Sequence, residues 1–203
     1  MQEHIPGQIT GHVLITDFLT QEVLADTHNA INWENFSLSL ANVLANEPRG
    51  WIQDMVFGNG GATVSGTGVI SYRPPNIIGQ SAALYNQTYS KVVNDKDKNQ
   101  LDTDTTKNLT HVNHVVGTYY SDVMVTCVLD LGEPDGQEAF DTATDFTSDY
   151  VFNELGLRAF SELGPDIKTS GPGLLLTHAV FSPIQKSLNR QIQIVYTLRL
   201  QTA

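Results

Sequence analysis

Cysteine is nearly absent from this chain, which has one thiol, Cys127, in 203 residues. A lone thiol excludes an internal disulfide framework and a zinc cluster built from cysteines. Alternating apolar residues predict a strand over residues 123–131, and one face of it would carry Val123, Val125, Cys127, Leu129 and Leu131. We therefore expect Cys127 to be a small buried side chain.

Basic residues are also scarce, with 11 lysines and arginines against 22 aspartates and glutamates, for a formal net charge of −11. A protein that binds nucleic acid needs a basic surface, because binding releases the counterions condensed on the phosphates. The composition therefore predicts no nucleic-acid partner.

Long apolar runs are missing as well. The longest apolar patches, at 173–176 and 179–181, are far too short to span a bilayer. The first ten residues, MQEHIPGQIT, have neither the basic start nor the apolar run of a secretory signal. We expect a soluble protein that is made in a cytoplasm, has no membrane partner and forms a single domain over residues 1–203.

The clearest pattern that is present lies at the C-terminal end of the chain. Its apolar members alternate with mostly polar residues and are Ile192, Ile194, Tyr196, Leu198 and Leu200. A period of two residues predicts a long, half-buried β-strand. Because chain ends fray unless they are tied down, we expect this strand at the centre of a sheet.

The rest of the chain also favours strands. A hairpin is predicted over residues 8–25, and further strands are predicted at 51–57, 69–72, 150–160 and 174–181. Residues 82–93 fit a strand or a short helix, and a strand is favoured at 89–93. We expect residues 150–160 to form two short strands that pivot at Gly156, and residues 182–190 to connect the last two strands. Polar composition predicts exposed loops at about 94–110 and 137–149.

One helix is predicted at about 32–46. Asn32 is a suitable N-cap, Glu34 suits the first turn, and Pro48 and Gly50 follow the end. The apolar face of this helix would carry Trp33, Phe36, Leu40, Val43 and Leu44. We interpret Trp33 and Trp51 as core anchors rather than as a platform for sugars. The predicted fold class is therefore α+β and mainly β, with an antiparallel-rich sheet or sandwich, one helix and long polar loops.

Motifs for catalysis or cofactor binding are lacking. The glycines of 58–61 and 66–68 lack the third, spaced glycine of a dinucleotide loop, and no Gly-Lys-Ser/Thr sequence is present, so we predict turns. Asp95, Asp97 and Asn99 begin like a calcium loop. However, Gln100 replaces the glycine that allows the sharp turn, and Thr106 replaces the bidentate glutamate.

The remaining polar candidates also have structural interpretations. His111 and His114 are three residues apart and would face opposite sides of a strand. His178 stands in LLLTHAVF and is expected to be a hydrogen-bonded core or edge histidine rather than a catalytic base. An acidic, exposed segment contains Asp141, Asp145 and Asp149. We predict no catalytic, cofactor-binding or metal-ligating residues within one chain, although a symmetric oligomer can assemble a metal site on its axis.

Three short motifs occur in a fixed order between the helix and the closing strands: Phe57-Gly58-Asn59-Gly60, Leu84-Tyr85-Asn86-Gln87-Thr88-Tyr89 and Phe152-Asn153-Glu154-Leu155-Gly156-Leu157. Together they resemble structural proteins of tailed bacteriophages, and in particular the N-terminal attachment domain of phage tail-collar fibre proteins. The resemblance spans most of the chain. The long shaft and receptor-binding tip that follow this domain in fibre proteins have no counterpart here, so host-receptor binding is not carried over.

The resemblance implies a non-catalytic structural part of a bacteriophage virion that docks tail, neck, baseplate or fibre components together. It also implies other virion proteins as partners, a homo-oligomer with a trimer as the first expectation, and location in the virion after assembly in the host cytoplasm. A capsid decoration protein is the alternative from the same class. A carbohydrate-binding module for host surface glycans is a further alternative, and a glycan-degrading enzyme that uses Asp141, Asp145 or Glu154 is a fourth.

Overall fold

A five-stranded antiparallel sheet is organised around the C-terminal strand. The computed structural model describes residues 7–94, 107–134, 149–161 and 173–202. The order of this sheet is β2 (Val23–His28), β1 (Gln8–Asp17), β13 (Ile192–Gln201), β9 (Tyr120–Leu129) and β8 (Leu109–Asn113). Strand β13 is central and pairs along its whole length with β1 on one side and β9 on the other. The predictions of a central terminal strand and of an N-terminal hairpin are confirmed.

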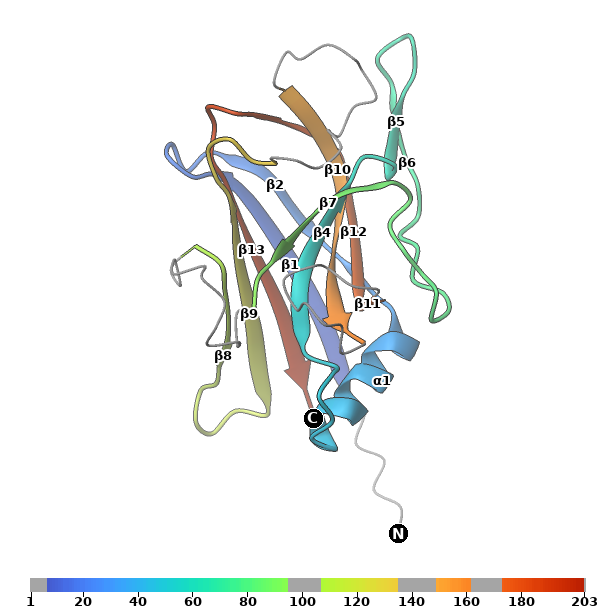
Figure 1. Cartoon of the computed structure of the whole chain (residues 1–203), viewed down its shortest axis with the longest axis vertical. Helices are drawn as coiled ribbons and strands as arrows, with labels where there is room; N and C mark the ends of the chain where they lie inside the picture. The colour runs from blue at the N-terminus through green and yellow to red at the C-terminus, as the bar shows by residue number, and fades with distance from the viewer. Residues whose placement is uncertain (1–6, 95–106, 135–148, 162–172, 203) are drawn as a thin grey trace.

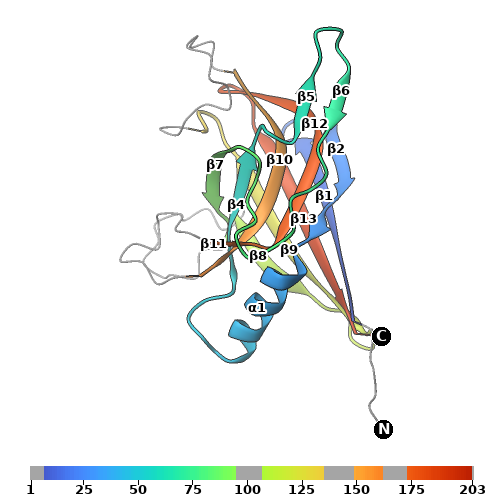
Figure 2. The same ribbon diagram turned by 90° about the vertical axis from the view of Figure 1, so that its right-hand side faces the viewer.

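A second antiparallel sheet packs against the first (Figures 1 and 2). Its order is β3 (Ala30–Ile31), β12 (Thr177–Ser187), β10 (Asp149–Phe160), β4 (Ile52–Gly58) and β7 (Gln87–Val92), and β11 (Gly173–Leu175) also pairs with β10. A third, two-stranded sheet consists of β5 (Ala62–Val64) and β6 (Ile70–Tyr72). The fold is α+β and mainly β, with antiparallel sheets in a sandwich-like arrangement, as predicted.

The hydrophobic core lies between the two large sheets. Alternate residues of β13 contribute Ile192, Ile194, Tyr196 and Leu198, all of them buried. The opposite sheet contributes an aromatic cluster in which the ring of Phe152 meets those of Phe57 and Phe181 edge to face, with centroid distances of 5.6 and 5.7 Å. Cys127 is fully buried in this core, and burial raises the pKa of its thiol to about 12, so the prediction of a small buried side chain is confirmed.

The helix α1 (Trp33–Leu44) begins after Asn32, whose Oδ1 accepts a hydrogen bond from the Asn35 N–H at 3.1 Å. Its position and its N-cap are as predicted, but its orientation is not. The side chains that face the body are Asn35, Phe36 and Ser39, whereas Trp33 is 55% exposed. Polar side chains face inward because backbone carbonyls need donors there: Asn35 Nδ2 donates to Leu175 O at 2.9 Å, and Ser39 Oγ donates to Gly50 O.

The interpretation of Trp33 as a core anchor is therefore wrong. Leu40, Val43 and Leu44 are also exposed, so most of the predicted apolar face of the helix has no cover among the described residues. Trp51 differs, because its ring is half-buried and stacks on Phe160 at 5.1 Å with an interplanar angle of 16°.

Residues 149–160 form one strand, not two strands that pivot at Gly156. Gly156 has a different role, because a Cβ atom there would lie 2.3 Å from the Thr177 carbonyl oxygen. The glycine lets the backbones of two strands approach closely. The connection predicted at 182–190 is also largely strand, since β12 continues to Ser187 through a bulge opposite Asn153.

Three smaller predictions at the ends of segments also change. Residues 109 and 110 were assigned to a loop but begin strand β8, and Asp149 begins β10. Leu131 follows the end of β9 in a turn and is exposed, so it does not share the apolar face of Cys127. Residues 94, 107 and 108 lie outside helices and strands and are half-buried, and the remaining residues of the two predicted loops, 95–106 and 137–148, lie outside the described residues.

Replacing Gly156 tests the close approach of β10 and Thr177. Gly156→Ala places a methyl group against a backbone carbonyl that cannot rotate away, so we expect a loss of about 1–3 kcal/mol in the free energy of unfolding. Gly66→Ala is the matched control, because nothing lies within 4 Å of a Cβ atom there. Urea denaturation measures both variants, and equal stability of the two would contradict this account of Gly156.

Candidate functional site

The side chain of Glu154 is the centre of a buried polar site on β10. Its Oε1 accepts hydrogen bonds from the N–H groups of Gly60 at 2.9 Å and Asn86 at 2.8 Å. Its Oε2 accepts from the Tyr85 N–H at 3.0 Å and from His178 Nε2 at 3.0 Å. The carboxylate is completely buried, and these four donors replace the water that it loses on folding.

His178 is also completely buried and completes this site. The N–H of Asn76 donates to His178 Nδ1 at 2.8 Å, so the proton of the ring lies on Nε2, which faces Glu154. The prediction of a hydrogen-bonded core histidine is confirmed.

Two effects act in opposite directions on the pKa of Glu154. Burial is the larger single effect and on its own would raise this pKa. The hydrogen bonds from His178 and from the N–H groups of Asn86, Tyr85 and Gly60 together outweigh burial, and the pKa lies below its ordinary value. The carboxylate is therefore ionised in the folded protein at neutral pH.

The three motifs that carry the resemblance to phage proteins meet at this site. Gly60 ends the first motif, Tyr85 and Asn86 belong to the second, and Glu154 belongs to the third. Asn153 adds to the connection, because its Oδ1 accepts from the Gly61 N–H at 2.8 Å and its Nδ2 donates to the carbonyl of Asn59 at 3.1 Å. Glu154 is enclosed and fully hydrogen-bonded, so in this state it has a structural role and does not face a substrate.

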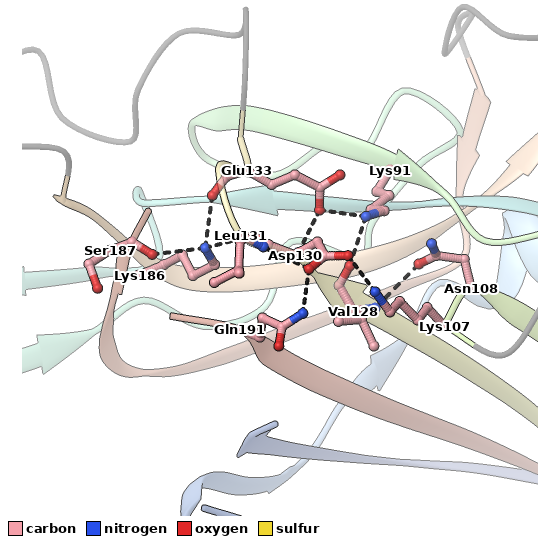
Figure 3. A network of polar contacts seen from close by, with 10 residues as sticks. All are labelled: Lys91, Lys107, Asn108, Val128, Asp130, Leu131, Glu133, Lys186, Ser187 and Gln191. Carbon is pink, nitrogen blue, oxygen red and sulfur yellow. Dashed lines mark hydrogen bonds and ion pairs between the residues drawn. The ribbon is translucent and has the colours of Figure 1, made fainter. Parts of the chain in front are cut away.

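A second buried polar cluster joins the ends of several strands (Figure 3). Lys186 on β12 is completely buried, and its Nζ donates to the carbonyls of Asp130, Glu133 and Ser187 at 3.0, 3.0 and 2.9 Å. Burial lowers the pKa of this ammonium group to about 8. Three carbonyl acceptors match the three N–H groups of the ammonium, so the cluster holds the turn after β9 against β12.

Two further lysines extend this cluster in Figure 3. Lys91 of β7 donates to the carbonyl of Val128 at 2.8 Å and pairs with Glu133, and Lys107 pairs with Asp130 at 2.6 Å. The hydrogen bond from Lys107 holds the pKa of Asp130 at about 2. Because its carboxylates pair with Lys91 and Lys107 and the Lys186 ammonium is bound by carbonyls, we assign the cluster a structural role.

The other residues considered from the sequence do not come together. His111 is exposed on β8, and His114 lies beyond that strand, where its Nδ1 is 3.0 Å from both the Tyr120 carbonyl and Ser121 Oγ. Among the described residues, no group of three or more His, Cys, Asp or Glu side chains is arranged to hold a metal ion. The candidates Asp95, Asp97, Asn99, Asp141 and Asp145 lie outside the described residues, and nothing is described of the Asp149 side chain.

Exposed apolar side chains occur on elements at two opposite ends of the molecule. One end holds the helix α1 and the loop between β8 and β9, which lie apart from each other, and the other end holds the β5–β6 hairpin (Figures 1 and 2). We call the exposed apolar side chains of α1 and of this loop the helix-end surface; they are Trp33, Leu40, Val43, Leu44, Val115, Val116 and Tyr119. We call the hairpin, residues 62–72, the arm; its exposed apolar side chains are Val64, Val69, Ile70 and Tyr72.

Neither surface is predicted from the sequence. The apolar spacing in the helix was recognised, but it was assigned to the core. The available signal for the arm was the distribution of charge, since residues 55–90 contain a single charged side chain, Arg73, in a chain with 33 charged residues.

Comparison of the chain with protein-family models, curated proteins and solved structures finds no match. In the part of the chain that the structure describes, no helix has the length and apolar character needed to cross a membrane.

Replacing the Glu154 carboxylate tests its structural role. Glu154→Gln keeps the shape but replaces one acceptor oxygen with an NH₂ group that faces two donors, so we expect a loss of at least about 3 kcal/mol in the free energy of unfolding. Thermal and urea denaturation at pH 7 measure this loss. A variant as stable as the wild type would contradict the assignment.

The pH dependence of stability in the wild type and in Glu154→Gln tests the ionisation of Glu154. Because the pKa of Glu154 is lower in the folded state, its ionisation stabilises the fold fully above the unfolded value of about 4.5 and progressively less as pH falls toward the folded value. Stability measured between pH 7 and pH 3 should therefore fall more steeply for the wild type than for Glu154→Gln. Parallel curves would show that this carboxylate has no preference for its ionised form in the folded protein.

Proposed function

We propose that this protein is a non-catalytic structural component of a bacteriophage virion that docks tail, neck, baseplate or fibre parts together. The observation that carries the proposal is that exposed apolar side chains lie on elements at opposite ends of the sandwich. Clusters of exposed apolar side chains mark surfaces for other proteins, and two of them at opposite ends suit a part that joins two neighbours.

The virion assignment rests on the resemblance of the three motifs to the attachment domain of tail-collar fibre proteins. Their convergence on Glu154 supports it, because the motifs then describe one structural unit rather than three unrelated matches. The partners proposed here are other virion proteins and further copies of this chain, with a trimer as the expected assembly. No nucleic-acid or membrane partner is proposed.

Two other functions remain in competition with this proposal. A capsid decoration protein would use the same surfaces at a different place in the particle. A carbohydrate-binding module is favoured by one observation, the exposed ring of Trp33, because sugars stack on exposed aromatic rings. Trp51 cannot share this role in the present arrangement, since its ring stacks on Phe160.

Electron microscopy of purified particles labelled with antibody to this protein tests the proposal directly. We expect label on tails, necks or baseplates, and label on the head would favour the decoration alternative. Absence of the protein from purified particles would reject the virion assignment. Calorimetric titration with host surface polysaccharide separates the third function, which predicts measurable heat at millimolar glycan.

Charge placed on the helix-end surface should prevent docking without unfolding the protein. Leu40→Asp with Leu44→Asp should leave the melting temperature nearly unchanged, because both side chains are exposed, and should reduce incorporation into particles at least tenfold. Leu19→Asp is the control, since Leu19 is an exposed leucine outside both surfaces. Quantitative immunoblotting of purified particles measures incorporation, and normal incorporation of the double variant would remove the helix from the docking surface.

A further inference from the structure

The arm is an amphipathic ribbon whose apolar face, beyond the buried Ala62, has no cover among the described residues. Ala62 pairs with Tyr72 and Val64 pairs with Ile70, so these four residues share one face of the ribbon. Thr63 pairs with Ser71 on the other face. Alternation of apolar and polar side chains is typical of a ribbon with one face buried. In this structure, however, residues 63–74 are all exposed.

The body holds the arm only near its base, as far as the described contacts go. Tyr72 OH and Ser182 Oγ are 2.7 Å apart, the Arg73 N–H donates to the Gly61 carbonyl at 2.9 Å, and Asn153 Nδ2 donates to the Ala62 carbonyl at 3.2 Å. The part beyond the base extends past the two large sheets (Figures 1 and 2). An isolated two-stranded ribbon is marginally stable in water, so the apolar face of the arm would gain stability from a partner.

A groove of about 300 Å³ opens beside the base of the arm. Its apolar lining comes from Leu24 and Ala25 of β2, Val180 and Phe181 of β12, and Tyr72 of the arm itself. Among the described strands, β2 is the edge of its sheet, and β12 beyond His178 pairs with β10 alone. An extended ribbon that enters this groove therefore meets apolar side chains and unpaired strand edges together.

The distribution of charge favours another copy of this chain as the occupant of the groove. Two copies of a chain with a net charge of −11 repel one another wherever acidic surfaces meet. The arm contains no charged residue, and Asp26 is the one charged side chain in the lining of the groove. An arm in the groove of another copy therefore adds apolar contact without placing two carboxylates against each other.

We propose that the arm of one copy packs its apolar face into the groove of the next copy. This inference deepens the proposed function and rests on its claim that the chain self-associates. The donor surface, Val64 and Ile70, differs from the acceptor surface around Val180 and Phe181, so the contact is head-to-tail. A head-to-tail contact that closes on itself forms a ring, which agrees with the trimer proposed above.

Engineered disulfides between separate copies test this contact. Val64→Cys is made in one chain, Ser182→Cys is made in another chain with a tag of different mass, and the two are mixed under mild oxidation. The native thiol of Cys127 is completely buried and does not compete. We expect a disulfide-linked pair that contains one chain of each kind.

Val116→Cys replaces Ser182→Cys in the control mixture, because Val116 is exposed on the helix-end surface at the other end of the molecule. Failure of the mixed pair to form, or formation in equal yield with the control, would overturn the proposed contact. Linkage only between two Val64→Cys chains would also overturn it, since this would show arms that meet each other instead of a groove.

A charge series gives an independent readout. Val64→Asp with Ile70→Asp should shift the mass measured by light scattering from three chains to one, because it places two carboxylates in the apolar contact. Thr63→Asp with Ser71→Asp adds the same charge to the opposite face and should leave the mass at three chains. Equal masses for the two double variants would reject the arm as the contact.

The two proposals fail separately. Particles labelled by antibody together with an unchanged mass for Val64→Asp with Ile70→Asp would retain the virion function and remove the arm contact. A mixed disulfide together with unlabelled particles would retain the contact and remove the virion function.

Discussion

The Glu154 carboxylate is the interaction on which the arrangement of this protein most depends. Four donors converge on its two oxygens, from the turn after β4, from the residues just before β7 and from β12. Strand pairing places these segments beside one another, because β10 pairs with β4 and β12 at Glu154 and β4 pairs with β7 next to the site. A buried charge is costly unless every lone pair is used, so the segments must come together for the fold to form. Hydrogen bonds to Glu154 and Asn153 also hold Gly60 and Gly61, which precede the arm. The start of the arm is therefore held against β10.

The Lys186 cluster performs a related task with the opposite charge. It binds three carbonyls from the turn after β9 and from the end of β12, which belong to different sheets. The two polar centres and the aromatic core between them hold the sheets in a fixed relation. Sheets held in one arrangement suit the proposed role of joining neighbours, because each contact then costs less conformational entropy when it forms.

Much of the fold could be predicted from the sequence because the side-chain period reports the local backbone. The alternation at 192–200 predicted β13, and Asn32 predicted the start of α1. The errors have a common physical cause. A period identifies which side chains share a face, but it does not tell whether another element covers that face, so Trp33 and Leu44 were assigned to the core. Gly156 likewise signals a special backbone position, but only the neighbouring strand shows that the requirement is close approach rather than a bend. The Glu154 site depends on segments far apart in sequence, which no local pattern connects.

The distribution of charge agrees with the proposal of different partners at the two ends. The arm and the stretch around it carry one charge in residues 55–90, whereas the chain as a whole is strongly acidic. Repulsion between acidic bodies weakens contacts between copies everywhere except at such neutral surfaces, so the arm is suited to self-association. The helix-end surface includes Trp33 beside the acidic Glu34 and lies at the opposite end of the body. Copies joined through their arms would leave that end free, and it could then present several identical apolar surfaces to one larger partner. Several weak contacts made at once raise the overall affinity without requiring any single surface to be large.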